Sequence, residues 1–467
     1  MQPGVTKSSP GYHLEQAHQY LSELGPLDDH GLELGRRGAT KLGPAGRRAF
    51  ARGDMAAAAN LLRRAVNLLP ERDPSRVELL PDLAEVMTEI GEFAWGEVFL
   101  DEAMDAAQAI GDPTLEAHVT LGRLLIQRFG DDAAWGEQVV AVTKDVIEVF
   151  EGVEDYAGLA KAYRLLCLVH GTASHWAAFL AAGDRDLHYA TLAGDRRARM
   201  RAVTARAIAA NYGPEPVEPA IAHCEEALEL AAGNRRSEGL VMSYLAELEA
   251  LHGNFDRARE LCRTSREILL DAGAEIQAHG TASRAGPVEL LAGDAAAAVA
   301  RLRIDYEALA ELNEIYFAST LAALLGEALY VAGDYDEAAA FTRKAEELAP
   351  EDDTWTQAAW RSTRAKLIAV ENGTGDGNGE EAVALARRGV ELLQTTDAPV
   401  WRANALCDYA TVLEAYGRTD EAQAGFEEAL ALYESKAASV PAERTRMRLD
   451  QIGSGAVVAG SSTPRAR

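Results

Sequence analysis

STLAALLGEALYVAGDYDEAAAFTRKAEELAP, residues 319–350, contains two helical periods in succession. Apolar residues in its first half recur at i, i+3, i+4, i+7 and i+8, which predicts one buried stripe of an α-helix. They are Leu321, Ala322, Leu325, Ala328 and Leu329. After Gly333-Asp334 a second stripe runs from Tyr335 through Ala338, Phe341 and Ala345 to Leu348. Pro350 ends it, because proline has no N–H to donate and its ring clashes with the preceding turn.

Small residues occupy the positions where two antiparallel helices would touch. Gly326 lies on the first helix, and Ala338 and Ala345 lie on the second. With Tyr330, Phe341 and Pro350 they fall at or beside the motif positions of a tetratricopeptide (TPR) unit, which this stretch resembles.

A glycine-centred turn returns along the chain at intervals of about 40 residues. The ten turns are Gly53-Asp54, Gly91-Glu92, Gly130-Asp131, Gly171, Gly213-Pro214, Gly253-Asn254, Gly293-Asp294, Gly333-Asp334, the glycine-rich 373–379 and Gly417-Arg418. A small residue follows most of them five positions later, as at Ala58, Ala258 and Ala298. An alanine-rich helical protein without repeats would not keep its alanines in phase with the turns.

The sequence therefore predicts an all-α, TPR-like helical-repeat solenoid of about ten helix pairs in a right-handed superhelix. We expect a disordered leader at 1–10, a short helical segment at 11–34 and the repeat array at 35–438. A flexible insertion at 371–381 (ENGTGDGNGEE), a capping helix at 439–453 and a disordered tail at 454–467 complete the organisation. Gly183-Asp184 predicts a broken helix, and Gly286-Pro287 predicts a kinked or shortened one.

Composition narrows the class of protein. The chain of 467 residues is 48% hydrophobic and only 6% aromatic, which favours helix over sheet. No run of 18 apolar residues and no apolar signal core occurs, so we expect a cytoplasmic protein without membrane contact. The net charge of −27 argues against nucleic acid as a partner and permits a basic protein or peptide. Four widely spaced cysteines, Cys167, Cys224, Cys262 and Cys407, predict reduced thiols packed between helices.

Motifs for chemistry are absent from the sequence. No lysine follows a glycine, which excludes the phosphate-binding loop, and no histidine precedes a glutamate, which excludes H-E-x-x-H. His170, His175 and His188 do not share a helical face, so we expect packing or surface histidines rather than a metal site. A run of arginines between 196 and 206, balanced by nearby aspartates, predicts a solvated face. We therefore expect no enzyme activity and no cofactor or metal.

The remaining candidate site is a surface. In TPR-like arrays the first helices of each pair line the concave side, and charged or aromatic residues there would contact a partner. The candidates in this chain are Glu85, Glu89, Lys161, Glu247, Glu327, Tyr330 and Glu414. A mostly acidic groove would suit a basic helix or an arginine-bearing peptide. Charged residues that only keep an exposed helix hydrated are an equally good explanation.

Several stretches resemble one family more specifically. GYHLEQAHQY, AFARGDMAAAANLLRRAVNLLP, VELLAGDAAAAVARLRIDYEALAEL, STLAALLGEALYVAGDYDEAAAFTRKAEELAPEDD and ALCDYATVLEAYGRTDEAQAGFEEALALYESK are similar to the C-terminal region of actinobacterial multidomain signalling proteins. In those proteins an adenylate/guanylate cyclase domain precedes an AAA/STAND-type ATPase and a TPR-like tail. The resemblance covers residues 11–450 and is weakest at 171–213. The segment 11–34 resembles the end of the ATPase module, so the family's catalytic motifs would lie upstream of Gly11.

The resemblance implies a non-catalytic interaction or regulatory module associated with nucleotide signalling or a regulatory ATPase. An alternative is a split or truncated cyclase–ATPase whose catalytic domains lie on other sequence. A weaker alternative is the tail of a transcription regulator. The sequence identifies neither the protein partner nor the oligomeric state.

Overall fold

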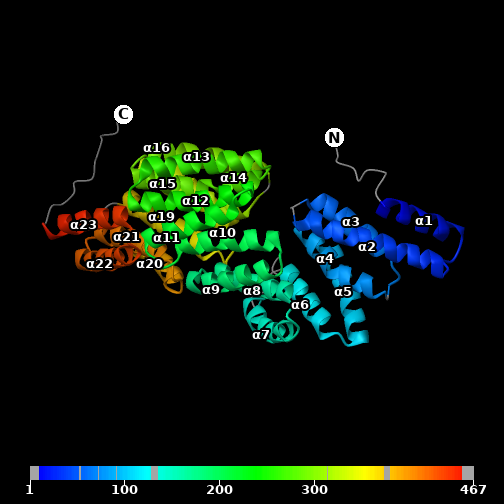
Figure 1. Cartoon of the computed structure of the whole chain (residues 1–467). Helices are drawn as coiled ribbons and strands as arrows, with labels where there is room; N and C mark the ends of the chain where they lie inside the picture. The colour runs from blue at the N-terminus through cyan, green and yellow to red at the C-terminus, as the bar shows by residue number, and fades with distance from the viewer. Residues whose placement is uncertain are drawn as a thin grey trace. The chain divides into compact units, whose positions relative to one another are not determined.

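A computed structural model describes residues 10–51, 54–71, 73–90, 92–127, 135–312, 314–372 and 379–454. These residues form α-helices joined by short turns and contain no β-strand (Figure 1). The predicted all-α solenoid of about ten pairs is confirmed, because in these residues ten helix pairs follow one another from α2–α3 to α21–α22. In the seventh pair the first helix is split into α14 and α15.

The chain divides into two compact units. Unit 1 comprises Met1–Val169 and Asp184–Arg199, and unit 2 comprises His170–Gly183 and Met200–Arg467. The division falls within α8 (Tyr156–Thr172), α9 (Trp176–Leu192) and α10 (Arg196–Tyr212).

Unit 1 begins with α1 (Pro10–Leu24), which packs against α2 of the first pair. Besides parts of α8, α9 and α10, unit 1 also contains α2 (Asp29–Ala51), α3 (Met55–Asn67), α4 (Pro74–Glu89), α5 (Phe93–Ile110), α6 (Pro113–Gln127) and α7 (Trp135–Val153). Arg64 of α3 forms an ion pair with Glu15 of α1, with Nε and Oε1 2.8 Å apart. The helical segment that opens the chain is therefore tied to the repeats that follow it.

Unit 2 holds the larger part of the array. Its further helices are α11 (Val217–Ala231), α12 (Arg235–His252), α13 (Phe255–Asp271), α14 (Glu275–Gly280), α15 (Ala282–Ala292), α16 (Ala295–Glu311), α17 (Tyr316–Ala332), α18 (Tyr335–Leu348), α19 (Thr354–Asn372), α20 (Gly379–Gln394), α21 (Pro399–Ala415), α22 (Thr419–Lys436) and α23 (Ser439–Gly453). Successive first helices pack side by side, as α15, α17, α19 and α21 do.

The stretch 319–350 folds as the sequence predicts. Gly333 adopts a φ of 85°, a left-handed conformation that costs glycine little, and the next helix starts at Tyr335. Ala349, the residue before Pro350, is extended and ends α18. Ala338 and Ala345 are fully buried, and a Cβ added to Gly326 would lie 3.5 Å from the carbonyl oxygen of Ala338. The small residues therefore set the close approach of α17 and α18.

Replacing Ala338 with leucine is expected to lower the free energy of unfolding by about 1–3 kcal/mol, because the larger side chain overpacks this joint. Urea denaturation followed by circular dichroism measures the change. Ala339→Leu, one position along the same helix and half-buried, is the matched control. An unchanged midpoint for Ala338→Leu would contradict the proposed contact.

Three details of the prediction are wrong. Helix α9 is continuous through Gly183-Asp184, because one glycine inside a helix costs only about 1 kcal/mol relative to alanine. Gly171 belongs to α8, and Ser174 (φ 54°) provides the left-handed turn residue. Both ends of the predicted 371–381 insertion are helical, since Glu371 and Asn372 belong to α19 and 379–381 begin α20. Residues 373–378 lie outside the described residues, as do 1–9 of the leader and 455–467 of the tail.

The first helix of the seventh pair is interrupted at Thr281, between α14 and α15. Gly286 and Pro287 themselves lie inside α15, several residues after this interruption. Pro287 donates no hydrogen bond within α15. A Cβ at Gly286 would lie 2.8 Å from a methyl group of Leu302 on α16, so the glycine permits close packing of the two helices.

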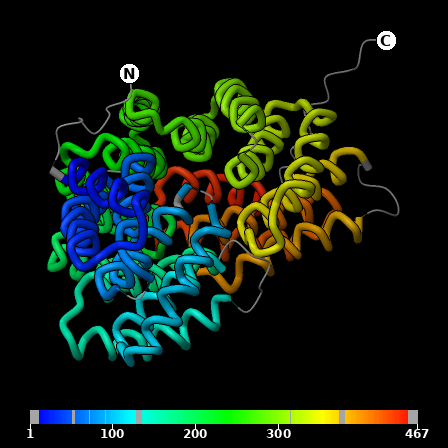
Figure 2. The backbone as a smooth tube through the Cα atoms, turned by 90° about the vertical axis from the view of Figure 1, so that its right-hand side faces the viewer, coloured from blue at the N-terminus to red at the C-terminus, as the bar shows by residue number. Residues whose placement is uncertain are grey.

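The two ends of unit 2 meet (Figure 2). The carboxylate of Asp397 accepts hydrogen bonds from the N–H groups of Trp176 (2.5 Å) and Ala177 (2.8 Å), and so caps α9. The ammonium of Lys436 donates to the carbonyl oxygens of Ala210 (2.8 Å) and Gly213 (2.7 Å), at the end of α10. Arg444 of α23 donates to the last carbonyls of α15. These bonds join residues that are 153–226 positions apart.

Candidate functional site

The predicted groove residues all lie on first helices of their pairs. Glu85 is on α4, Lys161 on α8, Glu247 on α12 and Glu414 on α21. Glu327 and Tyr330 share α17. The side chain of Glu89, the seventh candidate, lies outside the described residues. The structure brings these residues together as two separate groups and leaves two of them apart.

The first group borders a depression in unit 1, which we call hollow 1. It encloses about 450 Å³ of space, including the solvent at its mouth, and four of its twelve lining residues are leucines. The Nζ of Lys161 lies 3.1 Å from one oxygen of Glu85, and Nη1 of Arg164 lies 3.2 Å from the other. Burial alone would lower the pKa of Lys161, but the charges of Glu85, Asp82 and Asp195 outweigh it and raise the pKa. Lys161 therefore carries its charge at neutral pH.

A histidine–aspartate pair stands at the edge of hollow 1. Nε2 of His118 lies 2.7 Å from Oδ2 of Asp155, while Oδ1 of Asp155 accepts from the N–H of Gly158 and caps α8. Burial by itself raises the pKa of Asp155. The hydrogen bonds from His118 and Gly158 stabilise the carboxylate more strongly, so the pKa lies below its usual value. This carboxylate is used in helix capping, and sequence reasoning had not selected it.

One member of the second group, Tyr330, lines a depression in unit 2, which we call hollow 2. Seven residues line it: Tyr330, Lys366, Ala369, Val370, Thr411, Val412 and Ala415. Lys366 of α19 is only 4% exposed, and its Nζ lies 2.6 Å from Oε2 of Glu327 and 2.8 Å from Oδ1 of Asp408 on α21. The same nitrogen lies 4.8 Å from the centre of the Tyr330 ring, within cation–π range. Glu327, Lys366 and Asp408, which we call the charge triad, join three consecutive first helices.

The three groups of the charge triad have differently shifted pKa values. Burial lowers the pKa of Lys366, but the negative charges of Asp408 and Glu327 have the larger combined effect and raise it above the usual value. Burial raises the pKa of Asp408 to about 6, only partly offset by Lys366. Glu327 is also desolvated, but its bonds from Lys366 and Thr363 bring its pKa below the usual value. Above pH 6 the charge triad therefore carries a net charge of −1.

Glu247 belongs to a different, largely aromatic region of unit 2. Its carboxylate accepts a 2.7 Å hydrogen bond from Nδ2 of Asn211, and burial raises its pKa. Nearby, the buried Arg284 lies 4.7 Å from the centre of the Tyr244 ring. A chain of ring contacts continues through Tyr212, Trp176, Trp401 and Trp355. Residue spacing does not predict this cluster, because its members are spread over the whole of unit 2.

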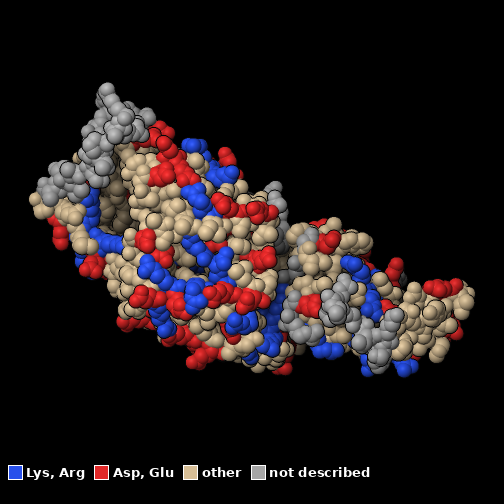
Figure 3. Space-filling model, turned by 90° about the horizontal axis from the view of Figure 1, so that it is seen from above, with Lys and Arg blue, Asp and Glu red and all other residues tan. Residues whose placement is uncertain are grey.

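Glu414 lies apart from both hollows. It forms a 2.6 Å ion pair with Arg448 of α23, and both side chains are partly exposed. Such pairing of opposite charges is common on the surface, where acidic and basic side chains intermix (Figure 3). The chain's negative charge is therefore not gathered into one acidic field on the face shown.

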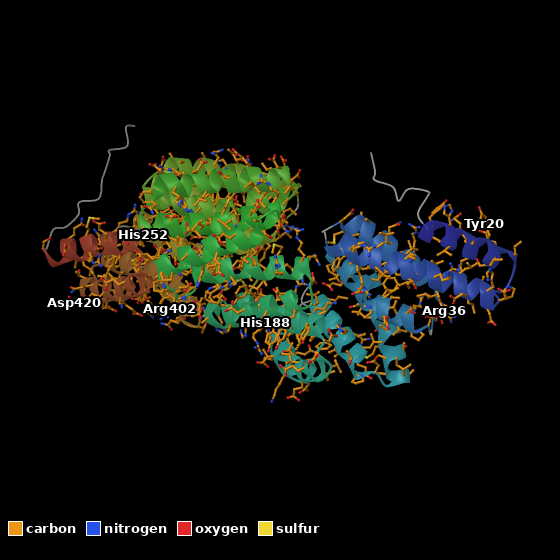
Figure 4. All side chains as sticks on the ribbon, viewed as in Figure 1. Tyr20, Arg36, His188, His252, Arg402 and Asp420 are labelled. Carbon is orange, nitrogen blue, oxygen red and sulfur yellow. The ribbon has the colours of Figure 1, made fainter. Side chains whose placement is uncertain are left out.

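The histidines of the 170–188 segment take ordinary packing positions. A ring nitrogen of His175 lies 3.1 Å from the carbonyl oxygen of Thr395, and the ring of His188 on α9 meets Tyr189 edge-on (Figure 4). Within the described part of the chain, no group of three or more His, Cys, Asp or Glu side chains is arranged to hold a metal ion. No helix in those ranges combines the length and apolar character needed to cross a membrane.

Similarity to known proteins is limited to solved structures. No protein-family model and no curated protein matches the chain. Among solved structures, human IFIT1 bound to m7Gppp-AAAA is 13% identical, with a TM-score of 0.49 and 95% of each chain covered. Yeast Tom70 is 14% identical, with a TM-score of 0.40 and 95% of this chain and 97% of that chain covered. A Rap protein complexed with competence and sporulation factor is 12% identical, with a TM-score of 0.45 and 83% and 99% covered.

Proposed function

We propose that this chain is a non-catalytic, cytoplasmic protein-interaction module that regulates a nucleotide-signalling enzyme or its ATPase. The observation that carries the proposal is the pair of hollows, which are lined by polar side chains of consecutive first helices. Glu85, His118 and Lys161 of α4, α6 and α8 line hollow 1, and Tyr330 and Lys366 of α17 and α19 line hollow 2. Consecutive helices of a solenoid present such residues as one extended surface, which suits a peptide or a protein segment.

The nucleotide-signalling part of the proposal rests on the resemblance of segments within 11–450 to the tails of cyclase–ATPase proteins. In such proteins a helical tail would report partner binding to the catalytic domains. We propose a basic partner, because a chain of net charge −27 attracts positive surfaces and repels the phosphates of nucleic acids and anionic lipids.

The test combines the purified chain with a cyclase–ATPase protein from which the TPR-like tail has been deleted. We expect the chain alone to produce no cyclic nucleotide and to hydrolyse no ATP. Added in trans, it is expected to bind the tail-less enzyme and to change its rate of cyclic nucleotide formation. Binding is measured by biolayer interferometry and the rate by chromatography of the product.

The outcomes separate the alternatives. Activity of the chain by itself would overturn the non-catalytic assignment. Restoration of an otherwise inactive enzyme would favour a split cyclase–ATPase over a separate regulator. No binding and no change in rate would contradict the association with nucleotide signalling.

A further inference from the structure

We propose that one edge of unit 2 is the docking surface for a protein segment that combines apolar side chains with lysine or arginine. The turns from α13 to α14 and from α16 to α17 form this surface, and the turn from α18 to α19 borders it. The inference deepens the proposed function, on which it rests, by naming where a basic partner docks.

An exposed apolar patch lies on this edge. We call it the edge patch, and its members are Ile276 (38% exposed), Leu312 (44%), Ile315 (57%) and Tyr316 (63%). Leu312 follows the end of α16, Ile315 precedes α17, and Tyr316 is the first residue of α17. Large apolar side chains that are exposed together, unlike those scattered singly, mark interaction surfaces.

The packing of α14 places Ile276 beside the start of α17. Helix α14 contacts α13, α16 and α17 (Figure 1). A Cβ added to Gly280 would lie 3.1 Å from the ring of Phe317, and that ring meets Tyr316 edge-on. Ile276 precedes Gly280 by four residues, so the two share one face of α14. The edge patch is therefore one surface formed by two consecutive helix pairs.

Carboxylates border the edge patch. The first helices α15, α17 and α19 pack side by side, so the turns that lead into their pairs follow one edge of the unit. Five exposed acidic residues, which we call the edge carboxylates, lie in or beside these turns: Asp271, Glu275, Glu311, Glu347 and Glu351. The sequence has no lysine or arginine at 267–283, 304–342 or 345–360. The negative charge of these turns is therefore not interspersed with cations.

The edge carboxylates do not hold the fold together. Within the part of the chain that the structure describes, none of the five forms an ion pair or a side-chain hydrogen bond. By contrast, Glu337 and Glu346 of α18 pair with Arg303 and Arg364. A lysine or arginine from a partner could therefore pair with the edge carboxylates without breaking an existing contact.

Charge complementarity decides which occupant fits. A second copy of the chain docked through the same edge would bring the edge carboxylates of both copies against each other. Nucleic acids and anionic lipids carry phosphates, which the same carboxylates repel. An amphipathic helical segment with an apolar stripe and flanking lysines or arginines complements both the edge patch and its charged border.

The test measures binding of a fluorescent, amidated helical peptide of leucine and lysine to the full chain by anisotropy. A leucine–glutamine peptide of the same length controls for apolar binding. The charge variant combines Glu275→Gln, Glu311→Gln and Glu347→Gln, which removes three exposed charges at nearly constant size. Circular dichroism checks that each variant keeps its helices.

Two further variants make the test specific. The patch variant combines Leu312→Ser and Ile315→Ser, which leaves the charges in place. The matched control combines Asp256→Asn, Asp336→Asn and Asp420→Asn, in the exposed first turns of α13, α18 and α22 (Asp420 in Figure 4). It removes three charges at the opposite ends of second helices. That distance is about 21 Å for the 14 residues of α18, beyond the Debye length of about 8 Å at about 0.15 M salt.

We expect the charge variant and the patch variant each to weaken binding of the lysine peptide about five- to tenfold, and the control to change it less than about twofold. Unchanged binding by either variant, equal loss in the charge variant and the control, or equal binding of the glutamine peptide would overturn the docking surface. Dimerisation of the unmodified chain in sedimentation velocity that the patch variant abolishes would overturn it in favour of a second copy. Because the trans assay with the tail-less enzyme does not depend on this peptide, failure of the docking surface is distinguishable from failure of the proposed function.

Discussion

Replacing Lys366 with methionine is expected to lower the free energy of unfolding of unit 2 by about 3 kcal/mol. The substitution leaves Glu327 and Asp408 facing each other without the ammonium that both contact at 2.6–2.8 Å. Breaking a buried ion pair by removal of one partner typically costs about 3–5 kcal/mol. We expect the lower end because both carboxylates are partly exposed.

The pH dependence of this loss has a definite sign. Without Lys366 the two carboxylates raise each other's pKa above the values in the unfolded chain. The folded state then binds more protons than the unfolded state at mildly acidic pH, so the Met variant gains stability as the pH falls from about 7 to about 5. Urea denaturation at both pH values measures the effect.

A triple variant provides the control. Lys366→Met combined with Glu327→Gln and Asp408→Asn removes all three charges, and replacing a whole buried ion cluster is often close to neutral. We expect the triple variant to regain most of the lost stability. A single Lys366→Met variant with the original urea midpoint would show that the charge triad does not hold α17, α19 and α21 together.

Replacing Lys436 with methionine is expected to destabilise unit 2 by about 2–4 kcal/mol. The side chain is fully buried, and its ammonium satisfies the carbonyl oxygens of Ala210 and Gly213 at the end of α10. Each buried carbonyl left without a donor costs about 1–3 kcal/mol. Removal of a buried charge returns part of that loss. Lys344→Met, at an exposed position of α18, is the matched control.

Titration of Lys436 adds a second test. Burial lowers its pKa from 10.5 to about 8, although Glu215, Cys224 and Glu247 oppose the change. Between pH 8 and 10.5 the unfolded chain therefore binds more protons at this residue than the folded chain does. The stability of the natural chain relative to Lys436→Met should rise as the pH increases through this window. If the stability advantage of the natural chain over Lys436→Met instead became smaller with rising pH, the lowered pKa of the buried Lys436 ammonium would be contradicted.

The helix pairs were predictable because their determinants are local. Gly333, Ala338 and Pro350 act within one pair, and their recurrence in phase identifies the repeat without knowledge of distant contacts. The predicted helix break at Gly183 was wrong because the outcome there depends on distant contacts. A glycine inside a helix is tolerated where neighbouring residues such as Trp176, Phe179 and Tyr189 are buried, and that burial depends on tertiary packing.

The candidate site was only partly predictable. The repeat register correctly placed Glu327 and Tyr330 on one helix, but their partners Lys366 and Asp408 follow 39 and 81 positions after Glu327. A buried lysine within an amphipathic pattern cannot be told from a surface lysine by sequence spacing. Reversal of Glu247 or Glu327 to lysine is consequently a poor test of partner binding, because it would also place a cation inside a buried polar cluster.

Hydrogen exchange of the full chain, alone and with the tail-less cyclase–ATPase protein bound, tests the central claim most directly. If the chain is an interaction module that binds through first helices, protection should increase in α17, α19 and α21 and stay unchanged in α18, α20 and α22. Protection confined to the second helices, or spread evenly over both sets, would contradict the account.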